Sequence, residues 1–79
     1  MVLTKRSAMA PDGAFCFGCN RGFGQGSPAV VFATDLVPDS DRAEVAGLYF
    51  HPGHLIRYAH RRNWTELANY IEAHGALNF

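Results

Sequence analysis

The sequence lacks any long hydrophobic run, and no stretch approaches the roughly 20 apolar residues of a membrane-spanning helix. Lys5 and Arg6 near the start are not followed by an apolar segment, so the pattern of a secretory signal is missing too. We therefore expect an intracellular, cytoplasmic protein with no membrane partner. In such a reducing compartment, paired cysteines indicate metal ligands or redox groups rather than a structural disulfide.

An excess of charge of either sign is also missing, because seven Lys and Arg residues balance seven Asp and Glu residues. This balance weakens the case for strong nonspecific binding to nucleic acid, which requires many cations facing phosphates. Hydrophobic residues make up 48% of the chain and charged residues only 18%, which excludes a disordered tail. Six Phe, three Tyr and one Trp supply large side chains for a folded core.

The chain has little length from which to build that core, since 79 residues suffice for one domain. In so small a core, about 25 cal/mol per Å² of buried apolar area is nearly cancelled by about 1.5 kcal/mol of entropy per ordered residue. Small domains usually compensate with disulfides, a metal ion or a partner chain. We expect an N-terminal arm over residues 1–14 and, over residues 15–79, a single domain that is stabilised in one of these ways.

Turn residues and hydrophobic patterns predict a loop and two strands after the arm. Residues 15–27, with the sequence FCFGCNRGFGQGS, indicate a tight irregular loop. Residues 29–37 and 44–50 have the β-branched and aromatic composition of strands. The turn-forming residues 38–41 separate them, so we expect an antiparallel hairpin.

Two helices are expected after the hairpin. Pro52 suits the first position of a helix that runs to about Arg62. Asn63 is predicted to be the N-cap of the second helix, with Glu66 completing a capping box. Gly75 is placed to end that helix. The predicted buried faces are Leu55, Tyr58 and Ala59 on the first helix and Trp64, Leu67, Ala68 and Ile71 on the second.

Two pairs of candidate metal ligands flank the expected hairpin. Cys16 and Cys19 form a Cys-x2-Cys pair on the loop, and His51 and His54 form a His-x2-His pair at the start of the first helix. Zn²⁺ prefers four nitrogen or sulfur ligands in a tetrahedron. Two thiolates, two neutral imidazoles and Zn²⁺ sum to zero charge, so the site can be partly buried. The sequence therefore predicts a zinc-binding domain stabilised by about 10–16 kcal/mol of apparent metal-binding free energy.

Other interpretations of these residues stay open. His60 or His74 could replace one proposed ligand, although His60 would lie off the helical face of His54. The cysteines could be buried and reduced without a metal, or could form a redox dithiol, which normally lies near a βαβ unit that is not expected here. The acidic residues Asp35, Asp39, Asp41 and Glu44 lack the spacing of a calcium loop and indicate a polar turn at the hairpin tip.

The Cys-x2-Cys loop, Cys16-Phe17-Gly18-Cys19, resembles a zinc knuckle, and we call it the knuckle. The order of knuckle, hairpin and ligand-bearing helix resembles the treble clef of LIM-type and poly(ADP-ribose) polymerase-type zinc fingers. Tyr49-Phe50-His51-Pro52-Gly53-His54-Leu55 is similar to their aromatic-His-x2-Cys-aromatic segment. The long gap between ligand pairs and the segment Asn63-Trp64-Thr65-Glu66-Leu67 are closer to the polymerase type. The resemblance covers residues 15 to about 70 and implies an α+β treble clef with an added C-terminal helix.

The chain departs from that family at two positions. The fourth ligand is His54 where the family has Cys, and Phe50 precedes the first His where Trp or Tyr is common. Fingers of the polymerase type bind DNA ends or nicks through backbone contacts and a stacking platform. The resemblance assigns only the four ligands in this chain, because those contact residues have no recognisable counterparts here.

The basic residues near the first helix and the knuckle suggest a function. Those assigned to a phosphate-binding face are Arg21, Arg57, Arg61 and Arg62. The first hypothesis is therefore a module that binds nucleic acid, DNA or RNA. The alternative is a protein-interaction adaptor, as many LIM-type fingers are, and the zero net charge and abundant aromatics favour it. We expect neither an enzyme nor a small-molecule substrate, because four protein ligands close the zinc coordination sphere.

Overall fold

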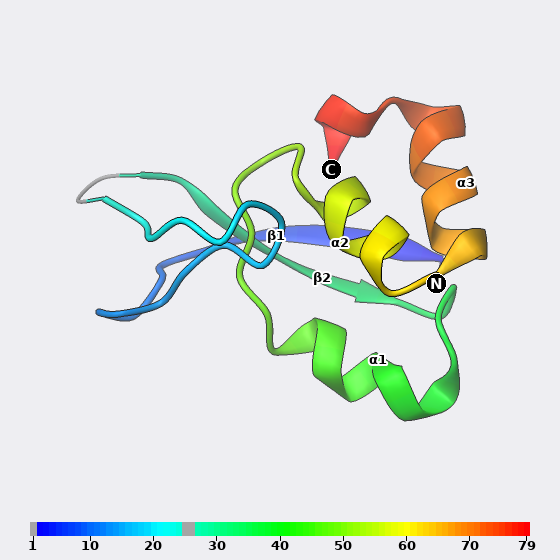
Figure 1. Ribbon diagram of the computed structural model, residues 1–79, viewed down its shortest axis with the longest axis horizontal. Helices are drawn as coiled ribbons and strands as arrows, with labels where there is room; N and C mark the ends of the chain where they lie inside the picture. The colour runs from blue at the N-terminus through cyan, green and yellow to red at the C-terminus, as the bar shows by residue number, and fades with distance from the viewer. Residues whose placement is uncertain (1, 25–26) are drawn as a thin grey trace.

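A computed structural model describes residues 2–24 and 27–79 as a small α+β fold (Figure 1). The elements in chain order are β1 (Leu3–Ala8), β2 (Ala29–Thr34), α1 (Asp39–Ala46), α2 (Leu55–Arg61), α3 (Thr65–His74) and the short 3-10 helix η1 (Ala76–Asn78). The strands pair in one antiparallel sheet, α1 packs against β2, and α2 packs against α3 (Figure 1). None of the helices in the described residues is long and apolar enough to cross a membrane.

Strand β1 lies within the segment that the sequence indicated as an arm. Its residue Leu3 is opposite Thr34 and its residue Ala8 is opposite Ala29 in the antiparallel register. The four middle residues of β1 are exposed, whereas β2 is largely buried. β1 therefore carries no alternating apolar pattern, and its pairing with β2 is what gives the segment a regular structure.

The predicted strand over residues 44–50 is wrong, and so is the hairpin that it was to form with residues 29–37. Residues 39–46 form α1 instead, with Asp39 and Asp41 in its first turn, where carboxylates favour the helix dipole. The acidic residues expected at a hairpin tip thus lie on or beside a helix. Only Phe50 keeps the predicted pairing, through an isolated bridge in which its backbone and that of Val30 exchange hydrogen bonds of 2.9 and 3.0 Å.

The two C-terminal helices are confirmed, with corrections at their starts. α2 begins at Leu55 rather than at Pro52, because a turn with Gly53 at a φ of +84° precedes it. The predicted N-cap at Asn63 is wrong, and with it the capping box. Asn63 instead adopts a φ of +57° after the end of α2, and Trp64 is the N-cap of α3. Gly75, at a φ of +89°, ends α3 as predicted.

The core is built from β2, the three α-helices and the loops beside them, and Leu3 of β1 and Ala76 of η1 pack against it while partly buried. Its fully buried side chains are Phe32, Phe50, Leu55, Leu67, Ile71, Val45 and Cys16. The predicted inner face of α3 is confirmed, because Trp64, Leu67, Ala68 and Ile71 are all buried. Leu55 and Ala59 are buried on α2, and Tyr58 is partly buried. Phe17 and Cys19, the second cysteine of the Cys-x2-Cys pair, pack against this cluster. The loop that carries the cysteines is therefore part of the core.

Polar contacts attach α1 to the turn between α2 and α3. The indole N–H of Trp64 donates a hydrogen bond of 3.0 Å to an Asp41 carboxylate oxygen. The guanidinium of Arg62 donates to Glu44, forms a 3.5 Å ion pair with Asp41 and donates to the Tyr58 hydroxyl at 3.1 Å. The acidic side of α1 is therefore neutralised by the residues that connect the two C-terminal helices.

Replacing Asp41 tests this attachment. We expect Asp41→Ala to lower the free energy of unfolding of the metal-loaded protein by about 1–3 kcal/mol, because it leaves the indole N–H of Trp64 without its acceptor. Asp39→Ala is the matched control in the same helical turn. The Asp39 side chain is 88% exposed and pairs only with Arg42, so its loss should cost about 0.5 kcal/mol or less. Urea unfolding measures both, and equal losses would contradict the assignment.

Candidate metal centre

The four ligands predicted from the sequence lie together in space. Cys16, Cys19, His51 and His54 each offer one donor atom, and these atoms all lie within 4.8 Å of one another. Cys16 is buried and the other three are partly buried, and both cysteines are free thiols. Segments more than 30 residues apart in the chain thus converge on one point.

The spacing of the donor atoms fits a tetrahedral metal site. The Cys16 sulfur lies 3.5 Å from Nδ1 of His54, and the Cys19 sulfur lies 3.5 Å from Nδ1 of His51. Metal–ligand distances of about 2.3 Å for sulfur and about 2.0–2.1 Å for nitrogen, at tetrahedral angles, place such donors about 3.6 Å apart. The two sulfur–nitrogen pairs therefore have the separation that a Zn²⁺-sized ion requires, with Nδ1 as the ligating atom of each imidazole.

The knuckle is shaped by backbone hydrogen bonds within residues 16–21. The Cys16 N–H donates to the Arg21 carbonyl at 2.8 Å, and the Asn20 N–H donates to the Cys16 carbonyl at 2.7 Å. Asn20 adopts a φ of +62°, a conformation that Asn tolerates and that closes the turn. The Gly18 N–H then points at the Cys16 sulfur and donates to it at 3.3 Å. This hydrogen bond from the backbone fixes the position of the Cys16 sulfur within the loop.

The histidine pair lies on the turn before α2. His54 is the N-cap of that helix, and its N–H donates to the His51 carbonyl at 3.1 Å. The His51 N–H donates to the Cys16 sulfur at 3.2 Å. The ring of Phe23 packs on the His51 ring with centroids 4.5 Å apart. Cys16 therefore receives N–H groups from both halves of the site.

The backbones of the two halves approach each other closely at Gly18. A Cβ added there would lie 2.5 Å from the carbonyl oxygen of His54 and 2.7 Å from its Cβ. Real Cβ atoms essentially never come this near to backbone atoms, so residue 18 must be glycine for the knuckle to reach the histidine turn.

The environment of His54 favours its metal-binding form. Burial lowers the pKa of the His54 imidazole from its ordinary value of 6.5, and the charges of Arg57 and His51 lower this pKa further. A lowered pKa keeps the ring neutral at neutral pH, and a neutral ring is the form that coordinates a metal.

The other two histidines have partners elsewhere. His60 lies 3.2 Å from a Glu72 carboxylate oxygen and links α2 to α3. His74 donates from Nδ1 to the Tyr70 carbonyl at 2.9 Å and stacks on the Tyr70 ring. Neither belongs to the cluster of four, so the alternative ligand sets that the sequence left open are not formed.

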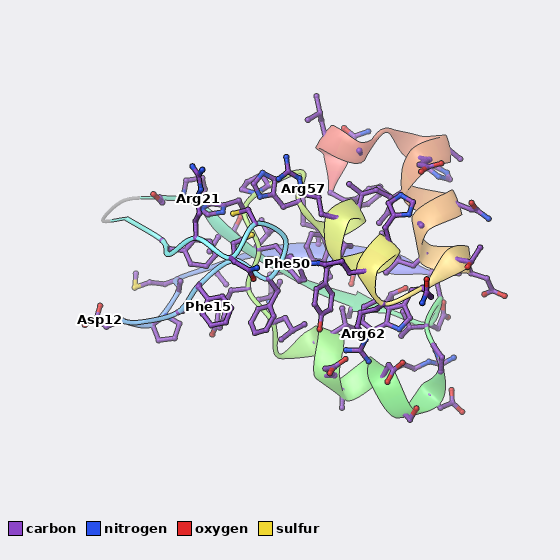
Figure 2. The ribbon with its side chains drawn as sticks, viewed as in Figure 1. Asp12, Phe15, Arg21, Phe50, Arg57 and Arg62 are labelled. Atoms are coloured by element: carbon purple, nitrogen blue, oxygen red, sulfur yellow. The ribbon has the colours of Figure 1, made fainter. Side chains whose placement is uncertain are left out.

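The four arginines assigned to a phosphate-binding face divide into two pairs. Arg61 donates to the backbone carbonyls of Phe17 and Gly18 in the knuckle, and Arg62 is bound to α1. The side chains of Arg21 and Arg57 are exposed and form no hydrogen bond or ion pair within residues 2–24 and 27–79. Figure 2 shows these two side chains extending upward from the knuckle and from α2, while Arg62 lies beside α1.

The fold and the cluster define a small α+β protein with a Cys-x2-Cys…His-x2-His cluster positioned for metal binding, consistent with a zinc finger. No protein-family model, curated protein or solved structure matches the chain.

Removing the metal tests whether the cluster stabilises the fold. We expect the native chain to carry one ion, and exhaustive chelation to abolish cooperative unfolding, because structural zinc contributes about 10–16 kcal/mol of apparent free energy in finger peptides. Native mass spectrometry measures the stoichiometry, and circular dichroism follows melting. Cys16→Ser should lose the ion, whereas His60→Ala, outside the cluster, should retain it. A chelated chain that melts as the untreated one does would contradict this role.

Substituting Gly18 tests the close approach of the two halves. We expect Gly18→Ala to weaken metal affinity by about 10–100-fold, the loss typical of disturbing groups around the ligands, because its methyl group displaces the His54 backbone. Gly22→Ala is the matched control in the same loop, since a Cβ there would meet only the Ala14 carbonyl at 3.8 Å. Competition with a chromophoric chelator measures both affinities. Equal affinities for the two variants would refute the steric argument.

Proposed function

We propose that this chain is a zinc-stabilised binding module in which Zn²⁺ has a structural role. The observation that carries the proposal is the convergence of Cys16, Cys19, His51 and His54, in which two sulfur–nitrogen pairs have the 3.5 Å separation expected of a tetrahedral site. Two thiolates and two imidazoles are a ligand set that Zn²⁺ favours. Four protein ligands complete the coordination sphere, whereas a catalytic zinc keeps one position for water or substrate. This supports a binding protein rather than an enzyme.

The arrangement around the metal supports a variant of the treble clef. The knuckle, the bridge between Val30 and Phe50, and α2 occur in the order that the resemblance implies. Helix α1 takes the place of the predicted turn and of the start of the second hairpin strand. We propose that this helix is an addition to the finger that covers β2, because Val45 of α1 is fully buried in the common core.

The partner that we propose is nucleic acid, contacted beside the metal centre by Arg21 and Arg57. The zero net charge of the chain hides an uneven distribution. Asp39, Asp41 and Glu44 on α1 are paired with Arg42 and Arg62, and Glu72 on α3 is paired with His60. Arg21 and Arg57 are left with exposed guanidinium groups near a site whose own charge would be zero. Cations so placed favour a polyanion.

The other two arginines support this role less well. The guanidinium groups of Arg61 and Arg62 are engaged with the knuckle and with α1. To bind a phosphate, either guanidinium group would first have to give up these contacts within the protein. We therefore assign phosphate contact to Arg21 and Arg57 alone.

A protein-interaction adaptor is the second candidate, and Phe15 favours it. Its side chain is 43% exposed, although its ring stacks on Phe17 with centroids 4.7 Å apart. An exposed aromatic ring held rigidly by a second ring is a suitable anchor for an apolar partner. Figure 2 shows Phe15 on the side of the knuckle away from Arg21.

Salt-dependent binding separates the two candidates. The metal-loaded chain is titrated into fluorescently labelled single-stranded, nicked and blunt oligonucleotides of DNA and RNA. We expect the fluorescence anisotropy of at least one of them to rise. Arg21→Gln and Arg57→Gln should each weaken this binding and reduce the slope of log K against log salt by about 1. Arg42→Gln is the control, because Arg42 is paired with Asp39. Absence of salt-sensitive binding to every oligonucleotide would exclude the nucleic-acid role and leave the adaptor.

A further inference from the structure

Arg61 reaches from the end of α2 to the knuckle. It is the last residue of the helix, and its Nη2 donates hydrogen bonds to the carbonyl oxygens of Phe17 and Gly18, the latter at 3.2 Å. Its guanidinium also lies over the Tyr58 ring, 5.5 Å from the centroid. The side chain is thus fixed by two carbonyls and an aromatic face, and it holds the loop that carries both cysteines.

One of these carbonyls belongs to the peptide group that binds the Cys16 sulfur. The Phe17 carbonyl and the Gly18 N–H are the two ends of the same peptide unit. The carbonyl accepts a hydrogen bond from Arg61, and the N–H donates one of 3.3 Å to the Cys16 sulfur. Hydrogen bonds in series polarise one another, so a cation on the carbonyl makes the N–H a stronger donor.

We propose that Arg61 is a positioning residue for the metal centre, acting on the Cys16 thiolate through the Phe17–Gly18 peptide. The guanidinium orients this peptide and strengthens its N–H···S hydrogen bond. The inference rests on the proposed metal binding by the cluster and is independent of any nucleic-acid contact. It reassigns Arg61 from the phosphate-binding face predicted from the sequence to the support of the ligands.

Helix α2 supplies two supports of the site from its two ends. His54 at its N-cap is a proposed ligand, and Arg61 at its last residue holds the knuckle. Between them, Leu55 and Ala59 are buried in the core. The rigid helix therefore fixes the distance between the His54 ring and the knuckle carbonyls. Groups around metal ligands that orient them in this way commonly contribute about 10–100-fold to metal affinity.

The proposed effect is specific to one of the two cysteines. The Phe17–Gly18 peptide donates to the sulfur of Cys16, so the charge of Arg61 is relayed to that thiolate. A hydrogen-bonded thiolate is less electron-rich and less nucleophilic than one without the bond. Loss of Arg61 should therefore weaken the hydrogen bond from the Gly18 N–H to the Cys16 sulfur and leave the one from the His51 N–H in place, whereas general loosening of the loop would affect both.

Cobalt substitution of the full chain tests the proposal, since Co²⁺ bound to thiolate absorbs by sulfur-to-metal charge transfer. For Arg61→Gln we expect Co²⁺ and Zn²⁺ affinities to fall by about 10–100-fold, because the knuckle loses the contact that orients its ligands. We expect the charge-transfer band to move to longer wavelength, because Cys16 becomes a stronger electron donor when its N–H···S hydrogen bond weakens. Arg61→Lys keeps a cation that can reach one carbonyl and should restore part of both properties. Arg6→Gln, the same change at an exposed residue of β1, should match the native chain.

A second measurement separates the relay from a purely structural role. In proton–nitrogen correlation spectra of the Zn²⁺-loaded protein, the amide proton of Gly18 should move upfield in Arg61→Gln, whereas that of His51, which donates to the same sulfur, should keep its position. An unchanged band and unchanged affinity would overturn the proposal. So would equal shifts of the two amide protons, which would indicate a general displacement of the Cys16 sulfur. A native chain that binds no Co²⁺ or Zn²⁺ would instead overturn the zinc-stabilised module itself, and this inference with it.

Discussion

The sulfur of Cys16 is the point on which the structure depends. It accepts N–H groups from Gly18 in the knuckle and from His51 in the turn, and it lies 3.5 Å from Nδ1 of His54. The same side chain is fully buried in a cluster with Phe50 and Leu55. The proposed metal coordination and the burial of the apolar core therefore involve the same residue. Because a core of this size is close to the break-even point between burial and entropy, we expect metal binding at this residue to strengthen the whole fold.

Helix α2 connects that local site to the rest of the tertiary structure. A helix of only seven residues is far too short to be stable alone, so it forms because both ends and one face are held. Its start is fixed by the histidine turn, and its end by Arg61 on the knuckle. Arg62 then attaches α1, and Trp64 opens α3. The contacts thus run from the candidate metal site through α2 to α1, which packs on β2, and to α3, which packs on α2.

Sequence patterns revealed the parts of the fold that carry strong local signals. The ligand spacing predicted which four side chains meet, and the apolar repeat from Trp64 to Ile71 predicted the inner face of α3. These signals suffice because chemistry or periodicity restricts the answer to one arrangement. Gly75 likewise adopts the positive φ that ends a helix.

The remaining elements could not be predicted because their local sequence signals are weak or are equally typical of another structure. β1 is exposed over Thr4–Ser7, so only its pairing with β2 distinguishes it from an arm. α1 buries Val45 alone, so no helical period is visible, and its N-terminal Pro38 and acidic residues are also typical of turns. Asn63 suits both an N-cap and a left-handed residue. Arg61 lies seven residues after His54, which is two helical turns along the same face. This spacing was the one sequence signal that Arg61 could lie on the same side of the helix as the ligand.

The internal use of arginines limits how the protein can bind a partner. With Arg21 and Arg57 as the proposed phosphate contacts, neutralising two phosphates gives a slope of log K against log salt of about −1.4 to −1.8. So shallow a dependence leaves most of the affinity to contacts other than charge. The exposed ring of Phe15, held by Phe17, can supply stacking worth about 1–3 kcal/mol per base, or can anchor an apolar protein surface. On the proposed function, the aromatic surface of the knuckle would therefore contribute more than its charge to the choice between a nucleic-acid and a protein partner.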